Sequence, residues 1–496
     1  MHPDRYDHAL VLGGGIAGLL AARVLADVFA DVTVVDRDAP PDAPANRRGI
    51  GQGRHAHALL ARGQQALEEL FPGITAQLAA AGAPTGDVLG DTRMHLNGHR
   101  LRRTTSGLLA VSASRALLEH HVRHRVAVLD RLTFAPPADV TGLVAEGQRV
   151  TGARLLRRAD HSAEEIVLAD LVVDATGRGS RAPKWLAALG CPTPDEERIR
   201  MDLGYATRRY RARPNDLGGD LASIHGPTPT HPRGGVLARI EHDQWLLTLA
   251  GMIGDHPPTD PEGYLAFARS LPFDDIARTI ADAEPLDDPV PYRFTASVRH
   301  HYERLDPAPI GFVPLGDSVA SFNPIYGQGM TVAALQALAL RDHLARPSRR
   351  QERSLPTAIV RATGIPWDMA AGADLAFPQV DGQRHIKHRV AEGYIRRLHA
   401  AAAHDADLAR AFVRVSGLVE SPTALFHPRI VAHVLRRRAM SQPQAPPHEP
   451  AGAPATNTAA DPNALRRRVR HVITDLEPAN LTHEPRLEGG SDSLGR

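Results

Sequence analysis

The sequence predicts an α/β protein in which a parallel sheet is combined with a mainly antiparallel sheet and a helical C-terminal region. Three observations predict this fold. A strand–turn–helix–strand unit stands near the start, two later strands end in short glycine motifs, and alternating segments lie between residues 191 and 301. With 496 residues, the chain is long enough for two or three structural units.

The first unit runs from His8 to Asp36. An apolar run over residues 9–12 ends in Gly13-Gly14-Gly15-Ile16-Ala17-Gly18, helix-forming residues follow, and a second apolar run over 32–35 ends in Asp36. A strand, a glycine turn, a helix and a strand that ends in an acid form the dinucleotide-binding fingerprint in its required context.

Each position of this turn has a physical role. Gly13 permits a sharp turn, Gly15 leaves room for a pyrophosphate at the backbone, and Gly18 permits close packing of helix on strand. The free N–H groups at the helix start, including those of Ile16 and Ala17, favour the negative charge of the pyrophosphate.

Asp36 is predicted to bind an adenosine ribose, because a carboxylate can accept two hydrogen bonds from its hydroxyls. Its charge argues against a 2′-phosphate, although the neighbouring Arg37 weakens that argument. The loop 39–53 carries Arg47 and Arg48. The sequence leaves open whether these arginines contact the cofactor or lie on a solvated loop.

The elements that follow are read from periodicity and caps. Helices are expected over residues 58–70 and 111–126, the second capped by Ser112 or Ser114 and carrying Arg115. Short polar strands are expected between 86 and 109, and further strands over 126–129, 139–144 and 150–156. His55 and His57 precede the first of these helices. No cysteine or suitably spaced carboxylate accompanies them, so no metal site is predicted.

Two later stretches each combine a strand with a glycine motif. The buried strand 171–174 ends in Ala175-Thr176-Gly177, where small residues permit close approach of a flat ring or a ribose. The second strand ends in Gly316-Asp317. A loop with Phe322, Asn323 and Pro324 follows it, and Gly327–Met330 opens a long helix whose positive end suits negative charge on a cofactor.

Between these stretches, the segments 203–211 and 235–251 alternate as antiparallel strands do and suggest a layer that holds substrate. Residues 345–440 have a helical pattern, and the segment 441–496, rich in Pro, Ala, Asp and Gly, is expected to be mostly disordered.

Composition excludes several classes of function. The net charge of +2 gives no field for nucleic acid. Cys191 is the single cysteine, so no internal disulfide forms, and a reducing cytoplasm is expected. No signal peptide and no apolar stretch of membrane-spanning length is seen, so no stable membrane insertion is expected.

With these motifs, the chain resembles the FAD-dependent class A monooxygenases of the para-hydroxybenzoate hydroxylase type. Gly13–Gly18, Asp174–Arg181 and Gly316–Met330 stand in the order of that family's three motifs. The middle motif departs from the family pattern, because Thr176-Gly177 stands where the family has Asp-Gly. The segments GQGRHAH (51–57), DATGRGS (174–180), YATR (205–208) and FNPIYGQG (322–329) are similar to those of actinobacterial epoxidases related to squalene epoxidases, which act on polyenes in polyether and polyketide biosynthesis.

The resemblance implies a Rossmann-like FAD-binding fold of the glutathione reductase type. Non-covalent FAD would bind at the glycine turn, Asp36, Arg37, Arg48, Arg115 and Asp317, with the backbone of Gly327, Gly329 and Met330 at the flavin. The implied FAD-binding part comprises residues 1–85, 108–190 and 302–345. A substrate-binding sheet would comprise 86–107 and 191–301, and a helical region 346–440.

The implied reaction is a monooxygenation. NAD(P)H would serve as co-substrate, and one atom of O2 would enter an apolar small molecule, most simply by epoxidation of an alkene. No side chain is assigned as a catalytic acid, base or nucleophile. Phe322, Pro324 and Tyr326 are expected either to form the pocket wall near the flavin or to pack as an ordinary loop.

Other functions stay open at this stage. A reductase of isoprenoid double bonds, similar to geranylgeranyl reductases, would share the cofactor motifs. An aromatic hydroxylase would need a group that polarises a phenol, and the sequence shows no evident tyrosine or histidine pair for this. A halogenase is disfavoured because no WxWxIP segment occurs. A non-catalytic flavin-binding module is the remaining class.

Overall fold

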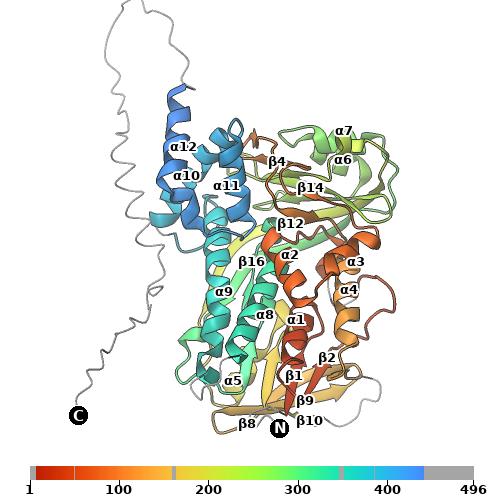
Figure 1. Cartoon of the computed structure of the whole chain (residues 1–496), viewed down its shortest axis with the longest axis vertical. Coiled ribbons are helices and arrows are strands. Elements are labelled where there is room, and N and C mark those ends of the chain that lie inside the picture. Colours follow the sequence, from red (N-terminus) through yellow and green to blue (C-terminus); the bar gives the residue numbers. More distant parts are fainter. Residues whose placement is uncertain are drawn as a thin grey trace, which may run out of the picture. The chain divides into compact units, whose positions relative to one another are not determined.

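The computed structural model describes residues 7–47, 49, 51–158, 164–345, 351–384 and 386–440 (Figure 1). Residues 1–422 form one compact unit, and a second unit begins at Thr423. The described part of the second unit contains α12 (Pro428–Met440). The predicted disordered tail, 441–496, lies outside the described residues.

A five-stranded parallel sheet forms the base of the first unit. Its strand order is β17-β11-β1-β2-β7, and every pair in it is parallel. The strands are β1 (His8–Leu12), β2 (Asp31–Val35), β7 (Leu132–Phe134), β11 (Leu171–Asp174) and β17 (Phe312–Pro314). Their apolar side chains are buried on both faces, as expected when helices and a second sheet cover a parallel sheet.

Helices of distant origin cover one face of this sheet. Residues of α1 (Ile16–Leu25), α4 (Arg115–Ala127) and α8 (Gly329–Leu344) share one apolar core with the strands. In Figure 1, α1 and α8 lie side by side, and α9 (Gln351–Asp374) runs next to α8. The opposite face packs against the three-stranded sheet β10-β9-β8 and α5 (Ala182–Ala188).

The second large sheet has eight strands and is mainly antiparallel. Its order is β18-β16-β12-β15-β14-β13-β4-β5, and β13 and β4 form the one parallel pair among the described strands of this sheet. The bounds are β4 (Thr92–Leu96), β5 (His99–Arg100), β12 (Glu196–Arg211), β13 (Ala222–His225), β14 (Arg233–Ile240), β15 (Gln244–Gly251), β16 (Val290–His300) and β18 (Ala320–Ser321). Helices α6 (Pro261–Arg269) and α7 (Asp275–Ala281) cover one face (Figure 1).

The remaining described elements are short or connect these layers. They are α2 (Ala61–Leu70), α3 (Ile74–Ala80), β3 (Thr85–Asp87), β6 (Leu109–Val111), β8 (Ala138–Glu146), β9 (Arg149–Arg157), β10 (Glu165–Leu168), α10 (Ile386–Ala402) and α11 (Ala406–Ser416). The expected combination of a parallel sheet, a mainly antiparallel sheet and a helical C-terminal region is therefore confirmed.

Several predicted bounds are wrong in detail. The helix expected from residue 111 begins at Arg115, because the Ser114 hydroxyl accepts a hydrogen bond from Leu117 N and caps it there. Residues 126–129 are not a strand, since α4 continues to Ala127. The segment 235–251 forms two strands separated by a turn, where His242 and Asp243 have positive φ.

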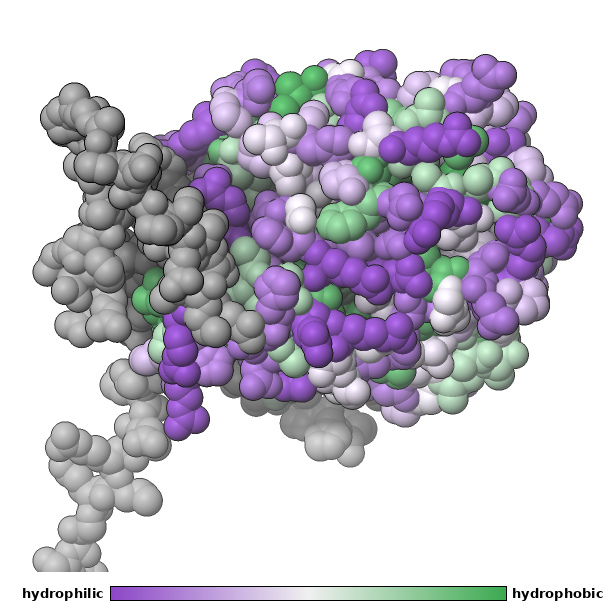
Figure 2. Space-filling view, turned by 90° about the horizontal axis from the view of Figure 1, so that it is seen from above, coloured by the Kyte–Doolittle hydropathy of each residue, from purple (hydrophilic) through white to green (hydrophobic). Residues whose placement is uncertain are grey.

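None of the helices within the described ranges combines the length and apolar character needed to cross a bilayer. The face shown in Figure 2 is mainly hydrophilic, with hydrophobic residues in separate small groups.

Candidate functional site

The three glycine motifs meet at one edge of the parallel sheet. β1, β11 and β17 are neighbours, and each is followed directly by its motif, at Gly13, Ala175 and Gly316. The carboxyl ends of parallel strands lie on the same edge, where open α/β sheets bind ligands. The fold thus brings together segments that lie about 160 and 140 residues apart in sequence.

The glycine turn has the geometry that its spacing predicts. Gly13 has a φ of +103°, and a Cβ there would lie 2.4 Å from the carbonyl oxygen of Ala175. A Cβ on Gly18 would lie 1.8 Å from the carbonyl oxygen of Gly13, so the predicted close packing of α1 is confirmed. At Gly15 the nearest atom is Arg47 Nη2, at 3.8 Å. The space in front of Gly15 is therefore the open part of the turn, next to the first N–H groups of α1 at Ile16 and Ala17.

Asp36 lies beside this turn and is already hydrogen-bonded within the protein. Its Oδ2 accepts from Gly14 N at 2.6 Å and from Arg47 Nη1 at 3.0 Å, and its Oδ1 accepts from Asp38 N at 3.0 Å. Burial alone would raise the pKa of Asp36, but Arg47 and these backbone donors hold it below its ordinary value. A ribose would have to share these oxygens or displace Arg47.

This arrangement changes the expected effect of removing Asp36. The sequence predicts weaker cofactor binding in Asp36→Ala without unfolding of the protein, whereas the structure predicts weaker binding together with a loss of stability. Two backbone N–H groups and Arg47 would lose their acceptor, which costs about 1–3 kcal/mol. Urea unfolding and dinucleotide titration of the same variant measure the two effects. An unchanged free energy of unfolding would show that Asp36 does not stabilise the turn. An unchanged affinity for the dinucleotide would show that Asp36 does not bind the ribose.

Glu119 connects the arginines around the site. Its carboxylate pairs with Arg47 at 3.0 Å, Arg115 at 3.1 Å and Arg123 at 2.8 Å, and Arg123 also donates to the carbonyl oxygen of Gly14. Three guanidinium groups thus share one buried carboxylate next to the glycine turn. Such a group of cations suits a ligand with phosphate charge.

The other predicted arginines differ in position. Arg37 is more than half exposed and pairs with Asp38 at 3.6 Å, so its side chain is directed to the surface. Arg48 lies outside the described residues. From the sequence, Arg47 could either contact the cofactor or lie on a solvated loop. In the structure its side chain is only 8% exposed and contacts Asp36 and Glu119.

The Gly316-Asp317 motif packs directly on the glycine turn. A Cβ on Gly316, whose φ is +68°, would lie 2.6 Å from the Cβ of Ala17. Burial raises the pKa of Asp317 above its ordinary value, while the charges of Arg115 and Arg178 oppose that rise. Asp317 is therefore close enough to both arginines to interact with them, as a shared site requires.

The start of α8 lies against the segment after His57. Gly327 has a φ of +64°, and a Cβ there would lie 2.5 Å from the Cβ of Ala58. A Cβ on Gly329 would lie 3.9 Å from Asp317 Oδ1, and Met330 is buried in the core shared with α1. The N-terminal end of α8 therefore points its free N–H groups to the Asp317 side of the site.

The loop between Asp317 and Gly327 packs on an aromatic cluster, which comprises buried residues of the eight-stranded sheet, this loop and α9. Phe322 and Trp367 are among its buried members, with ring centroids 5.9 Å apart, and Tyr326 packs against it. Tyr205 and Met252 are further buried members, and Tyr292 packs against the cluster. Pro324 begins a short turn in which Asn323 caps Ile325.

A histidine and tyrosines that sequence reasoning missed lie at the edge of this cluster. His55 is 2% exposed, its ring centroid lies 4.6 Å from that of Tyr205 and 5.5 Å from that of Tyr292, and its Nδ1 is 2.8 Å from Thr207 Oγ1. Its Nε2 has no hydrogen-bond partner within the described chain. Burial and Arg54 lower the pKa of His55 to about 4, so it is neutral at pH 7. Its position before a helix gave no signal of these contacts.

A cavity of about 330 Å³ adjoins His55 and Arg115. Its wall also includes Ser114 and Thr207, which places it between the start of α4 and the eight-stranded sheet. The volume suits part of a small organic ligand. The cavity therefore lies between Arg115, one of the residues predicted to bind the cofactor, and the sheet that was expected to hold substrate.

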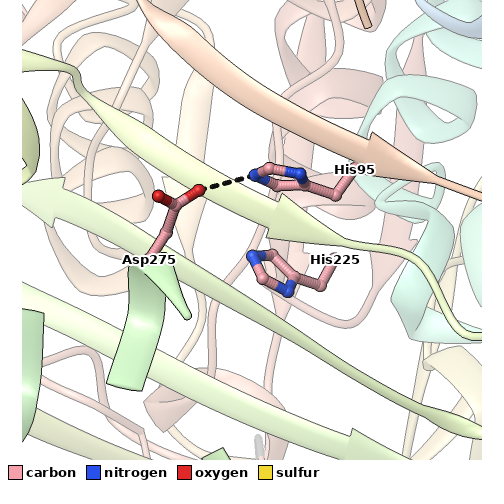
Figure 3. Close-up of side chains that lie close together, drawn as sticks. All are labelled: His95, His225 and Asp275. Atoms are coloured by element: carbon pink, nitrogen blue, oxygen red, sulfur yellow. Dashed lines mark hydrogen bonds and ion pairs between the residues drawn. The ribbon is translucent and has the colours of Figure 1, made fainter. Parts of the chain in front are cut away.

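A second histidine cluster lies on the sheet face covered by α7, away from this site. His95, His225 and Asp275 are buried, and one donor atom of each lies within 4.8 Å of the others (Figure 3). Figure 3 shows the His95 ring hydrogen-bonded to Asp275, with His225 beside it; the His95 Nε2–Asp275 Oδ2 distance is 2.6 Å. The donor types are those of a zinc site, although no metal site was predicted.

The surroundings of this cluster favour an ion network over a metal site. The Nδ1 atoms of His95 and His225 are buried and lack partners among the described residues, whereas metal-bound histidines normally donate the second N–H. Arg93 already pairs with Asp275 at 2.7 Å. Burial would raise the pKa of Asp275, but the hydrogen bonds from Arg93 and His95 lower it. We interpret this cluster as a structural network of ion pairs and hydrogen bonds that holds α7 against β4 and β13.

Asp275→Asn should destabilise the protein by about 3 kcal/mol, because it leaves the partly buried Arg93 without one of its carboxylates. Urea unfolding measures the change. Asp274→Asn is the matched control, since its side chain is 70% exposed and its loss should cost less than about 0.5 kcal/mol. A wild-type melting temperature that rises with Zn²⁺ and falls with EDTA would contradict this interpretation.

Comparison with known protein sequences identifies one relative over most of the chain. Protein Rv3254 of Mycobacterium tuberculosis is 36% identical over 461 residues, which cover 87% of this chain and 94% of that protein. No family model matches the chain.

Solved structures of flavoproteins share the fold at low sequence identity. The flavin-dependent brominase Bmp2 has a TM-score of 0.59 at 16% identity, covering 88% of this chain and 100% of its own. The p-nitrophenol 4-monooxygenase PnpA of Pseudomonas putida has a TM-score of 0.58 at 16% identity, covering 84% and 99%. A flavoprotein of Cytophaga hutchinsonii has a TM-score of 0.61 at 14% identity, covering 88% and 98%. The chain has the fold of these proteins and belongs to the same family as protein Rv3254.

Proposed function

We propose that the protein is an FAD-dependent monooxygenase that uses NAD(P)H and O2 to insert one oxygen atom into an apolar small molecule. The observation that carries this proposal is the aromatic cluster, because it packs on the loop between Asp317 and Gly327, next to the dinucleotide residues. An oxidising cofactor bound at those residues would thereby adjoin an apolar surface. The similarity to flavin-dependent folds and the sequence motifs support the same assignment.

The residues present fit FAD. Gly15 leaves room for the pyrophosphate at the start of α1, while Gly13 and Gly18 hold the turn and helix close to the strand. Asp36 would bind the ribose, and Arg115 and Asp317 would hold the chain that leads to the flavin. The backbone at Gly327–Met330 would face the ring. In this proposal, residues 1–85, 108–190 and 302–345 form the FAD-binding part, and 86–107 with 191–301 the substrate-binding part.

When bound, FAD would take a hydride from NAD(P)H and supply the activated oxygen. The protein would bind and orient the substrate, and the buried side chains of the aromatic cluster would exclude water. Electrophilic oxygen transfer to an alkene needs no side-chain nucleophile. We therefore propose epoxidation, and the epoxidase-like segments at 51–57 and 322–329 favour a polyene or polyketide as substrate.

Hydroxylation of an aromatic ring is the second candidate, because the structure brings His55 against Tyr205 and Tyr292. The unpartnered Nε2 of His55 would supply the polar group that the sequence did not reveal. Products distinguish the candidates, since an epoxide retains no alkene at the oxidised carbons, whereas a phenol retains its ring.

The test uses FAD-loaded protein with NAD(P)H, a panel of apolar alkenes and phenols, and ¹⁸O2. One ¹⁸O atom in the product is expected. Label incorporated only from H2¹⁸O would overturn the monooxygenase proposal. Saturation of a double bond without O2 would instead identify an isoprenoid-type reductase. Failure of the protein to take up FAD at micromolar concentration would contradict the assignment of FAD as its cofactor.

A further inference from the structure

Asp374, the last residue of α9, is a fully buried carboxylate with an incomplete set of partners. Its Oδ1 accepts hydrogen bonds from Asn323 Nδ2 at 2.7 Å and from the Tyr326 hydroxyl at 2.8 Å. Its Oδ2 has no partner in the described part of the chain and no solvent contact. Both donors belong to the loop that leads from Asp317 to Gly327.

The side chains that bond to Asp374 are uncharged, and the nearby Arg384 guanidinium donates to the backbone carbonyl oxygens of Leu375, Phe377 and Val380 instead. Asn323 is fully buried and also contacts Met252 Sδ at 3.8 Å, and Trp367 and Phe322 belong to the same cluster. Tyr326 is the one titratable group that acts on Asp374 within the described residues. On β12, α8 and the turn 302–304, which pack against α9, Arg198 pairs with Glu196, Arg200 with Asp381, Glu303 with His301 and Arg341 with Asp342. The helix α10 also packs against α9 and carries Glu392, Arg396 and Arg397, none of which is among the groups that shift the pKa of Asp374.

A carboxylate in such a place is most stable with a proton. Taking an ion out of water without an opposite charge costs several kcal/mol, and two neutral donors offset only part of that cost. Burial accordingly raises the pKa of Asp374 to about 7, against the lowering effect of Tyr326 and Asn323. The same burial, with Asp374, raises the pKa of Tyr326, which stays a neutral phenol.

The protonation state of Asp374 decides what the Tyr326 hydroxyl can do. When Asp374 is ionised, Tyr326 donates its hydrogen to Oδ1. When Asp374 carries a proton, the same 2.8 Å pair can reverse, so that the carboxyl donates to the phenol oxygen and the tyrosine hydrogen is free for another acceptor. Tyr326 packs, partly buried, against the aromatic cluster, where the substrate is proposed to bind.

We propose that Asp374 is a positioning residue that stores a proton behind Tyr326, and that Tyr326 delivers a proton to the oxygen that leaves as water during oxygen transfer. This inference rests on the proposed function. The overall reaction, NAD(P)H + H⁺ + O2 + substrate → NAD(P)⁺ + H2O + oxidised substrate, consumes one proton in each turnover. Tyr326 gives up its hydrogen and takes the proton of Asp374, and Asp374 regains the proton that each turnover consumes before the next cycle.

The first test needs neither cofactor nor substrate. Infrared spectra of the full chain from pH 5.5 to pH 8.5 should contain the carbonyl stretch of a protonated carboxylic acid that disappears near pH 7. Asp374→Asn should lack this band, and Asp368→Asn, a change on the same helix, should keep it. Absence of the band in the wild type at low pH would overturn the proposal, whether or not the protein is a monooxygenase.

The second test follows NAD(P)H-dependent O2 consumption of the FAD-loaded protein against pH. The wild-type rate should fall above about pH 7, and Asp374→Asn should abolish this break. Tyr326→Phe should slow turnover by roughly 10²-fold, as for loss of a proton donor. FAD content and melting temperature show that both variants fold. An unchanged pH break in folded Asp374→Asn would overturn the relay. If the wild type binds FAD but consumes no O2, the proposed function and the relay fail together, while the infrared band still reports the proton on Asp374.

Discussion

FAD binding should be abolished in Gly15→Val while the chain still folds. A Cβ at Gly15 meets no atom closer than 3.8 Å, and the φ of −78° suits any residue, so the larger side chain fits the protein itself. It would fill the space where the pyrophosphate meets the backbone. We expect the affinity for FAD to fall at least about 10²-fold, or about 3 kcal/mol.

Two other glycines make this experiment specific. Gly179→Ala should keep both fold and FAD, since a Cβ there meets nothing within 4 Å. Gly18→Ala should fail to fold stably, because its Cβ would lie 1.8 Å from the carbonyl oxygen of Gly13. Visible absorbance of purified protein gives flavin content, and circular dichroism reports folding. Normal flavin content in folded Gly15→Val would show that the dinucleotide does not lie along this turn.

The second large effect is a loss of stability in mild acid. His55, His225 and His399 are all at least 94% buried, and burial, the leading cause for each, lowers their pKa values from 6.5 to about 4, about 3 and about 4. Below pH 6.5 these histidines therefore become protonated in the unfolded chain but stay neutral in the folded chain. The stability is complete above pH 6.5 and is lost as the pH falls towards the folded-state values.

Between pH 7 and pH 5 each of these three histidines should lower the free energy of unfolding by about 2 kcal/mol, or about 6 kcal/mol together. This is comparable with the whole stability of a marginal domain. Urea unfolding at pH 7, 6 and 5 measures the loss, and His399→Gln should reduce it by about one third. His242→Asn is the control, since His242 is exposed and asparagine tolerates its positive φ. Equal stability at pH 5 and pH 7 would contradict the burial of neutral histidines.

The sequence by itself determined the features that depend on neighbours along the chain. The unit from β1 to β2 was predictable because the apolar runs, the glycine turn and the terminal acid all lie within about 30 residues. The cap at Ser114 and the start of α8 after Gly327 were also predictable from local chemistry, since a cap bonds N–H groups only two or three residues away.

The tertiary structure alone decided which side chains share the site. His55 meets Thr207 across 152 positions, Asn323 meets Asp374 across 51, and Arg47 joins Asp36 to Glu119 from a loop that the sequence left open. Periodicity reports which face of an element is apolar, whereas a hydrogen bond or an ion pair depends on separations of about 3 Å between atoms of different elements. Those separations are set by how sheets and helices pack, and for this reason the proton-storing position of Asp374 had no signal in the sequence.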